Sequence, residues 1–93
     1  MSNLAVKVSL SQEVLMQDLG GETVFLNCDR EEYFSLDEVG TRMLNVLEES
    51  PSVEAACQVL VAEYEVEPEQ LQQDLLALIQ QLEEHGLVKV TGA

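Results

Sequence analysis

The spacing of the apolar residues changes at Asp37 and divides the chain into a strand-like part and a helical part. Before Asp37, apolar and polar residues alternate in short runs, which is the two-residue period of half-buried β-strands. After it, apolar residues recur every three or four positions, which is the period of amphipathic α-helices. The sequence therefore predicts an α+β fold whose strands precede its helices.

Three runs in the first part are typical of an antiparallel meander. The first twenty residues have extended character, and Gly20-Gly21 then accepts the positive φ angles of a tight hairpin turn. The run 23–28 is the next strand, and the segment 32–37, which follows a second turn, begins as a strand and ends as a helix start. We expect a three-stranded antiparallel sheet whose last strand is aromatic.

Three helices are predicted after the sheet, each with a recognisable start or end. Asp37 can cap the first helix, Ser50-Pro51 ends it, and Ser52 can cap the second. Pro68 suits the first turn of the third helix, and Gly86 suits its termination. Each helix has one apolar stripe, made of Val39, Met43, Val46 and Leu47 in the first, of Val53, Ala56, Cys57, Leu60, Val61 and Tyr64 in the second, and of Leu71, Leu75, Leu78, Ile79 and Leu82 in the third.

The length and composition indicate a single globular domain, residues 1–93, with its functional site on the surface. A chain of 93 residues can bury a core but leaves no room for a sizeable internal cavity. Apolar residues make up 46% of the chain, which is the composition of a folded rather than a disordered protein. A last apolar run, 87–90, closes the chain as a short strand or an extended tail. Any ligand is therefore expected in a surface groove.

The charge and hydropathy of the chain exclude some partners. Eighteen acidic residues against four basic ones give a formal charge of −14, which repels phosphate backbones, so nucleic acid is not expected as a partner. The longest relevant apolar run, 75–79, is far shorter than the ~20 residues of a membrane span. Since the first residues also lack a signal-peptide pattern, we expect a cytoplasmic protein without membrane contact.

Neither the cysteines nor the histidine form a recognisable metal or redox motif. Cys28 lies in a strand-like run and Cys57 on a helical stripe, where a free cysteine behaves as a small apolar residue. We predict two reduced core thiols, although the sequence also leaves a disulfide open. There is no CxxC pair, and His85, the one histidine, falls in the last turn of the third helix, where it favours the helix dipole. No metal site and no cofactor are expected.

The sequence has no motif that supports catalysis. GxSxG, HExxH, P-loop and dinucleotide-binding glycine patterns do not occur, and His85 has no obvious nucleophile as a companion, so we expect a protein that is not an enzyme. The acidic runs 48–49 and 63–67 lack the spacing and the glycine of an EF-hand and are interpreted as solvated faces. An acidic acyl-carrier-like protein is an alternative, but Ser35-Leu36-Asp37 lacks the preceding Asp of the usual Asp-Ser-Leu triplet and follows two strands.

The segment 32–36 is the best candidate for a binding site. An exposed edge strand presents unpaired N–H and C=O groups, and an extended peptide can add to it as a further strand. Tyr33 and Phe34 would then supply the side-chain pockets. The same pattern also fits one aromatic residue in the core and the other on the surface with no ligand, so residue spacing alone leaves both interpretations open.

The order of these motifs resembles the PqqD family over about residues 13 to 90. The most specific part is the aromatic-x-Leu-Asp helix start, followed at this distance by a leucine-rich helix that ends in Gly-Leu. The segments that carry the resemblance are the Gly-Gly hairpin, Val24-Phe25-Leu26, Tyr33-Phe34-Ser35-Leu36-Asp37-Glu38-Val39-Gly40, Ser52-Val53-Glu54-Ala55-Ala56, Asp74-Leu75-Leu76-Ala77-Leu78-Ile79-Gln80-Gln81-Leu82 and Gly86-Leu87-Val88.

The resemblance implies a small winged-helix-like domain, a three-stranded antiparallel sheet followed by three helices, that serves as the recognition element for ribosomally made and modified peptides. Such domains bind the leader segment of a precursor peptide. In the family, the leader adds as a strand to the third strand and lies in a cleft against the third helix. Carried onto this chain, the resemblance implies a peptide-binding site made of Glu32, Tyr33, Phe34, Ser35, Asp74, Leu75, Leu78 and Ile79.

Within the family, the chain is most similar to the stand-alone leader-binding proteins of lasso-peptide biosynthesis, which implies delivery of the leader to a leader peptidase or another modifying enzyme. The alternative is a PqqD-type peptide chaperone for a radical SAM enzyme in quinone cofactor synthesis. The heavy acidity implies a leader that binds through apolar and aromatic residues together with Lys or Arg. The winged-helix likeness does not imply DNA binding, because four scattered basic residues cannot neutralise a run of phosphates.

Overall fold

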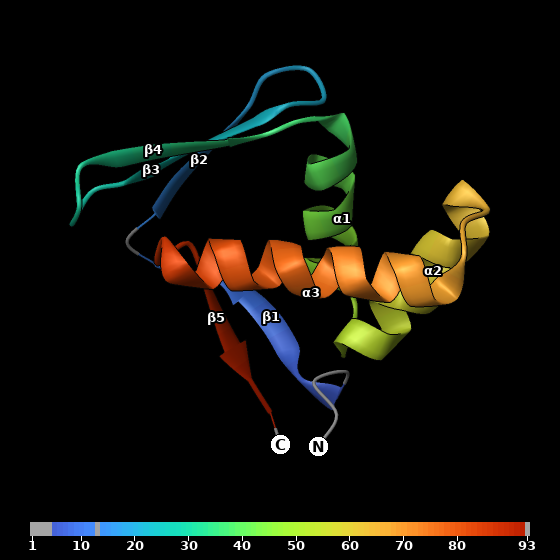
Figure 1. The fold of residues 1–93 in the computed structure, drawn as a ribbon. Helices are drawn as coiled ribbons and strands as arrows, with labels where there is room; N and C mark the ends of the chain where they lie inside the picture. Colours follow the sequence, from blue (N-terminus) through green and yellow to red (C-terminus); the bar gives the residue numbers. More distant parts are fainter. Residues whose placement is uncertain (1–4, 13, 93) are drawn as a thin grey trace.

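The computed structural model describes residues 5–12 and 14–92. Its elements in chain order are β1 (Lys7–Leu10), β2 (Val14–Asp18), β3 (Thr23–Asn27), β4 (Glu32–Leu36), α1 (Glu38–Glu49), α2 (Val53–Tyr64), α3 (Pro68–Glu84) and β5 (Val88–Thr91) (Figure 1). Strands β2, β3 and β4 form a three-stranded antiparallel sheet, and the three helices follow it, which confirms the predicted α+β fold.

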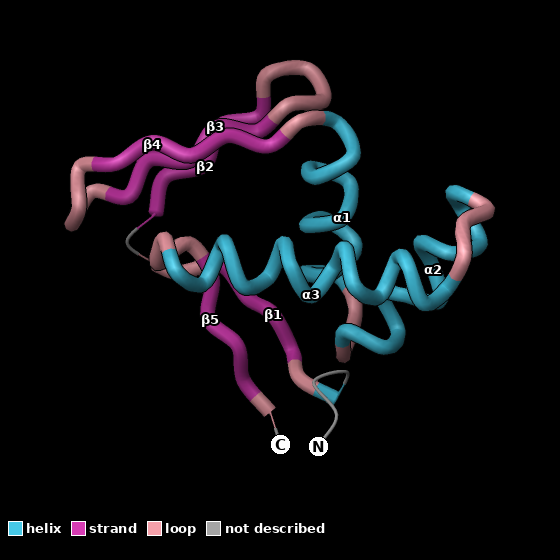
Figure 2. Tube along the Cα trace, viewed as in Figure 1, coloured by secondary structure: helices cyan, strands magenta, loops and turns pink. Residues whose placement is uncertain are grey.

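The first twenty residues contribute to two different sheets. β1 pairs with β5 in a separate antiparallel sheet, with Val8 opposite Val90, so the two ends of the described chain lie together (Figure 2). The apolar run 87–90 is therefore a strand rather than a tail. In Figure 1, this second sheet lies on one side of α3 and the three-stranded sheet on the other.

Short-range interactions set the turns and helix starts where the sequence predicts them. Gly20 and Gly21 adopt φ angles of 71° and 104°, as the predicted hairpin requires. The Asp37 carboxylate accepts a hydrogen bond from the Gly40 N–H at 2.8 Å and caps α1. Gly40 is also closely packed, because a Cβ there would lie 3.1 Å from the Leu36 side chain. These contacts place β4 directly before α1 and fix the direction in which the helix leaves the sheet.

The core lies between the inner face of the three-stranded sheet, the helices and β1. Its members include the fully buried side chains of Phe25, Leu44, Leu60, Leu75 and Leu82. Val8 of β1 belongs to the same core, so the second sheet also contributes buried apolar side chains to it. No helix within the described ranges is long and apolar enough to cross a membrane.

Lys7 links β1 to the end of α1. Its Nζ donates to the backbone carbonyls of Leu47 at 3.3 Å, of Ser50 at 2.7 Å, and of Glu48. The last carbonyls of a helix have no partner within the helix, and a cation beside them also complements the helix dipole. This partly buried lysine therefore supplies hydrogen-bond donors to a helix end that would otherwise need water.

The prediction of two core thiols is wrong for Cys28. This residue is exposed in the turn after β3, whereas Cys57 is half-buried and burial raises the pKa of its thiol. Val24 and Leu26 lie on the outer face of β3, because Thr23, Phe25 and Asn27 are the buried residues of this strand. Both cysteines are free.

Replacing Glu48 with glutamine is expected to stabilise the protein at neutral pH. Burial raises the pKa of the Glu48 carboxyl, Lys7 opposes this shift, and Glu49 adds to it. A carboxyl whose pKa is raised by folding destabilises the fold above that pKa, and the penalty disappears below the pKa of the unfolded chain. We expect Glu48→Gln to raise the melting temperature by about 1 to 2 °C at pH 7 and by less at pH 4.5.

Circular dichroism melting curves at the two pH values measure this effect. Glu49→Gln, which removes the same charge from an exposed neighbour, is the control for the general gain from reducing the acidity. An equal gain from both variants, or a gain that does not depend on pH, would contradict the role of burial.

Candidate functional site

β4 is an edge strand of its sheet. It pairs with β3 on one side, and no strand among residues 5–12 and 14–92 pairs with its other side. The predicted site residues Glu32, Tyr33, Phe34 and Ser35 all lie on this strand, as the sequence indicated. An uncovered strand edge is a template for a further strand.

The register identifies which backbone groups of β4 point out of the sheet. At the hairpin, the Leu19 N–H donates to the Glu22 carbonyl at 2.7 Å, so these residues form a hydrogen-bonded pair. Such pairs alternate along an antiparallel ladder, and neither ladder of this sheet skips a residue. Alternate residues of β3, starting with Thr23, therefore bond to β4. It follows that Tyr33 and Ser35 turn their N–H and C=O groups toward the free edge.

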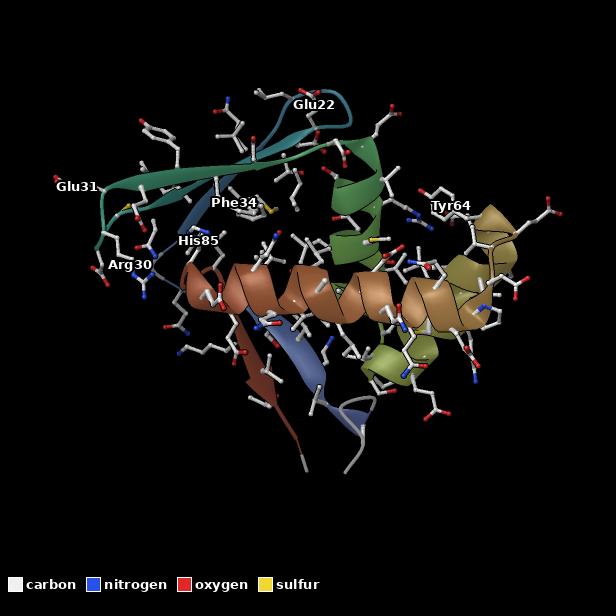
Figure 3. All side chains as sticks on the ribbon, viewed as in Figure 1. Glu22, Arg30, Glu31, Phe34, Tyr64 and His85 are labelled. Atoms are coloured by element: carbon white, nitrogen blue, oxygen red, sulfur yellow. The ribbon has the colours of Figure 1, made fainter. Side chains whose placement is uncertain are left out.

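Tyr33 and Phe34 point to opposite faces of the sheet. Phe34 lies on the inner face, where its ring centroid is 4.9 Å from that of His85 and 6.5 Å from that of Phe25. Figure 3 shows Phe34 and His85 directed toward one another from β4 and from the end of α3. Tyr33 lies on the outer face and is 75% exposed. The inner side of an added strand would therefore meet Phe34, and the outer side would meet Tyr33.

One flank of α3 faces the same region as Phe34. Asp74 and Leu78 lie eleven and seven positions before His85, a spacing that places all three side chains on one flank of the helix. Asp74 is exposed and accepts a hydrogen bond from Gln70 at 3.0 Å, while Leu78 is half-buried. Two of the predicted helix residues thus share the flank of α3 whose last member, His85, packs against Phe34.

The other two predicted helix residues lie elsewhere. Leu75 is fully buried in the core with 0% exposure. Ile79 is 6% exposed and lies on the opposite flank of α3, where it borders a hollow of about 500 Å³ together with Val6 and Val90. Helical spacing therefore places Asp74 and Leu78 on the flank of α3 that ends at His85, whereas Leu75 lies in the core and Ile79 on the other flank.

The turn between β3 and β4 is fastened to the end of α3. The Asn27 side-chain amide donates to the His85 carbonyl at 2.9 Å, and the Arg30 guanidinium donates to the Glu84 carbonyl at 2.7 Å. Gly86 has a φ angle of 71°, and a Cβ there would lie 2.9 Å from the Asn27 amide nitrogen. The strand edge and the flank of α3 are consequently held as one unit.

His85 is the site residue that the sequence interpretation missed. The sequence assigned it to the helix dipole, whereas the structure packs its ring against Phe34. The available signal was its spacing of seven residues from Leu78, which places the two on one helix flank. No group of three or more His, Cys, Asp or Glu side chains is placed to hold a metal ion in the described part of the chain.

Three of the described basic side chains, those of Lys7, Arg30 and Arg42, already have hydrogen-bond or ion-pair partners within the fold. Within the described ranges, the one ion pair joins Arg42 and Glu63, 2.7 Å apart, and it raises the pKa of the arginine and lowers that of the glutamate through their hydrogen bonds. Lys7 and Arg30 donate to backbone carbonyls. The candidate site therefore combines an aromatic strand edge with exposed carboxylates such as Asp74, which favours an apolar ligand that also carries positive charge.

Comparison with known proteins finds similar solved structures and a matching family. The structure is similar to "TbiB1 in Complex with the TbiA(beta) Leader Peptide", with a TM-score of 0.81 and 28% identity over 90% of this chain and 98% of that chain. It is also similar to "Lasso peptide synthetase B1 complexed with the leader peptide", with a TM-score of 0.80 and 26% identity over 89% of this chain and 98% of that one. No curated protein sequence matches the chain. The family model described as coenzyme PQQ synthesis protein D (PqqD) matches residues 22–88, and the chain therefore belongs to the PqqD family.

Proposed function

We propose that this protein is a non-catalytic recognition domain that binds the leader segment of a ribosomally made precursor peptide. The observation that carries the proposal is the free edge of β4, where Tyr33 and Ser35 present backbone groups beside one flank of α3. Two similar structures are leader-peptide complexes, which supports the same function here. The domain, acting as a single unit in the cytoplasm, delivers the leader to a leader peptidase or another modifying enzyme.

The leader adds to β4 as a fourth strand of the sheet. Main-chain hydrogen bonds to Tyr33 and Ser35 supply affinity without regard to sequence. Side chains of the leader alternate between the two faces, so those on the inner side meet Phe34 and Leu78 and those on the outer side meet Tyr33. Asp74 and Glu32 favour a leader that carries Lys or Arg near these contacts.

A second candidate is a peptide chaperone for a radical SAM enzyme in quinone cofactor synthesis, which the description of the matching family favours. The two candidates use the same strand edge and differ in the peptide they carry. Titration with a lasso-type leader and with a quinone-cofactor precursor, under the same conditions, separates them by affinity.

The test is a titration of fluorescein-labelled leader peptide, encoded beside this gene, followed by fluorescence anisotropy and by NMR. We expect saturable binding at micromolar or lower concentration, with chemical-shift changes concentrated in residues 31–36. Phe34→Ala is expected to weaken binding by about tenfold, since it removes a large apolar contact from the inner side of the added strand. Val59→Ala, at an exposed position on α2, is the control. Saturation without shifts in residues 31–36 would refute the site.

A further inference from the structure

His85 is the one histidine of the chain, and its ring packs against the inward-facing aromatic residue of β4. The ring centroids of His85 and Phe34 are 4.9 Å apart and the ring planes are inclined at 41°, with the two side chains directed toward one another from α3 and β4 (Figure 3). Both side chains are half-buried. The inward side chains of a strand added to β4 would therefore meet Phe34 together with the imidazole beside it.

The backbone of His85 is fixed independently of its side chain. Its carbonyl accepts a hydrogen bond from the Asn27 amide at 2.9 Å, and its N–H donates to the Gln81 carbonyl at 3.1 Å. Among the described residues, no ion pair involves the imidazole. The contribution of the ring is its packing against Phe34, so the ring can be replaced without removing the hydrogen bonds at the end of α3.

Phe34 has an aromatic neighbour on each of two elements. Phe25, which is fully buried on β3, lies at a centroid distance of 6.5 Å, and His85 supplies the second ring from the end of α3. Packing between aromatic rings favours particular separations and inclinations, so two such neighbours restrict where the Phe34 ring can lie. His85 is the half-buried one of the two, and it is therefore the neighbour whose surroundings change when a leader covers this side of β4.

The charged groups around His85 belong to β4, to the β3–β4 turn and to α3. Glu32 lies on the same face of β4 as Phe34, Arg30 reaches the Glu84 carbonyl from the turn, and Glu84 itself precedes His85. β3 and residues 87–88 carry no charge. The two glutamates favour a charged imidazole and the arginine favours a neutral one, but all three are present with or without a leader. A change on binding must therefore come from the leader.

We propose that His85 is a positioning residue for leader binding, which holds Phe34 in place as a neutral ring and loses its proton when the leader binds; this inference rests on the proposed leader-binding function. Covering a charged imidazole with a peptide costs free energy, because the charge is removed from water. A leader that carries Lys or Arg adds repulsion. Histidine is the side chain that ordinarily changes its charge between pH 5 and 8, so leader affinity falls as the pH is lowered through this range.

The test is the pH profile of leader affinity. The probe is the leader peptide encoded beside this gene, with any histidine of its own replaced by asparagine and with a rhodamine label, whose fluorescence does not change over this range. Fluorescence anisotropy at pH 5.5, 6.5 and 7.5 gives the affinities. The wild-type protein is expected to bind about fivefold more weakly at pH 5.5 than at pH 7.5.

Three variants separate the charge of the ring from its packing. His85→Phe keeps a ring against Phe34 without a titratable group, so it is expected to bind within about twofold of the wild type at pH 7.5 and equally well at pH 5.5. His85→Ala removes the ring and is expected to weaken binding about fivefold at both pH values. Glu32→Gln removes the carboxylate on the same face of β4 and is expected to keep the wild-type pH dependence.

Thermal melting checks that each variant is folded at both pH values. If phenylalanine does not fit in place of the imidazole, His85→Gln, which is also uncharged throughout this range, is expected to show the same loss of pH dependence. Calorimetric titration of the wild type at pH 6.5, in two buffers of different ionisation enthalpy, counts the protons released on binding. Release of a fraction of a proton is expected from the wild type and none from His85→Phe.

Equal wild-type affinity at pH 5.5 and 7.5 would overturn the proposal. So would a pH dependence that persists in the folded His85→Phe or His85→Gln variant, or wild-type affinity of His85→Ala at pH 7.5. Binding that does not depend on pH, with chemical-shift changes in residues 31–36, overturns the role of His85 and leaves the leader-binding function intact. Absence of leader binding at every pH overturns both.

Discussion

Replacing Ser35 with proline is expected to lower the affinity for the leader peptide at least about 30-fold while the domain stays folded, a difference of about 2 kcal/mol. The register turns the Ser35 N–H toward the free edge of β4, where it would donate to the leader backbone. Proline has no N–H, and its ring occupies the place from which the leader strand approaches. Proline is tolerated in an edge strand when the missing N–H faces solvent, so the ladder to β3 remains complete.

Two matched variants test this interpretation. Ser35→Ala keeps the N–H and removes the exposed hydroxyl, so it is expected to bind the leader within about twofold of the wild type. Phe34→Pro removes an N–H that bonds to β3 and is expected to destabilise the sheet itself. Fluorescence anisotropy gives the affinities and thermal melting gives the stabilities. Wild-type affinity in folded Ser35→Pro would show that the leader does not pair with β4 in this register.

The sequence predicts well the parts of this fold that depend on neighbours in the chain. Asp37 caps α1 through the N–H of Gly40, and the two hairpin glycines act on their own turn. The change from a two-residue to a helical period is also visible among neighbouring residues, because the spacing of apolar residues reflects which side of each strand or helix is buried. For these reasons the three-stranded sheet, the three helices and the aromatic edge strand could all be anticipated.

What the sequence does not predict depends on contacts between distant residues. β1 pairs with β5 at the other end of the chain, and neither run contains a turn signal that would join them. Alternation along β3 defines two faces but not which one is buried, because Val24 and Leu26 are as apolar as their neighbour Phe25. Cys28 was assigned to the core for this reason, and it lies on the surface.

The candidate site shows the same division. Its strand residues were identified together because they are consecutive, whereas the helix residues had to be chosen by face. The apolar spacing that suggested Leu75 and Ile79 reports burial in the core, so it cannot separate a core stripe from a ligand flank. His85, which shares a flank of α3 with Asp74 and Leu78, lies beside Phe34, and the Asn27 side chain at the end of β3 is bonded to the His85 carbonyl across 58 residues of sequence.

Replacing Lys7 with methionine is expected to lower the free energy of unfolding by about 2 to 3 kcal/mol. The Lys7 Nζ donates to three carbonyls at the end of α1, and methionine keeps the aliphatic stem while removing every donor. The carbonyls of Leu47, Glu48 and Ser50 would then lose their partner in a partly buried place. Urea unfolding followed by circular dichroism measures the loss, with the midpoint expected to fall and the slope to stay unchanged.

Lys89→Met separates this contact from the general effect of charge. Both variants change the formal charge from −14 to −15, but Lys89 is exposed on β5, so its loss is expected to cost no more than about 0.5 kcal/mol. Added salt screens the repulsion among exposed carboxylates and should diminish any cost that the two variants share. The additional cost of Lys7→Met should persist at 0.5 M salt because it comes from unpaired carbonyls. Equal stabilities of the two variants would mean that water replaces the Lys7 amine at the end of α1 without loss.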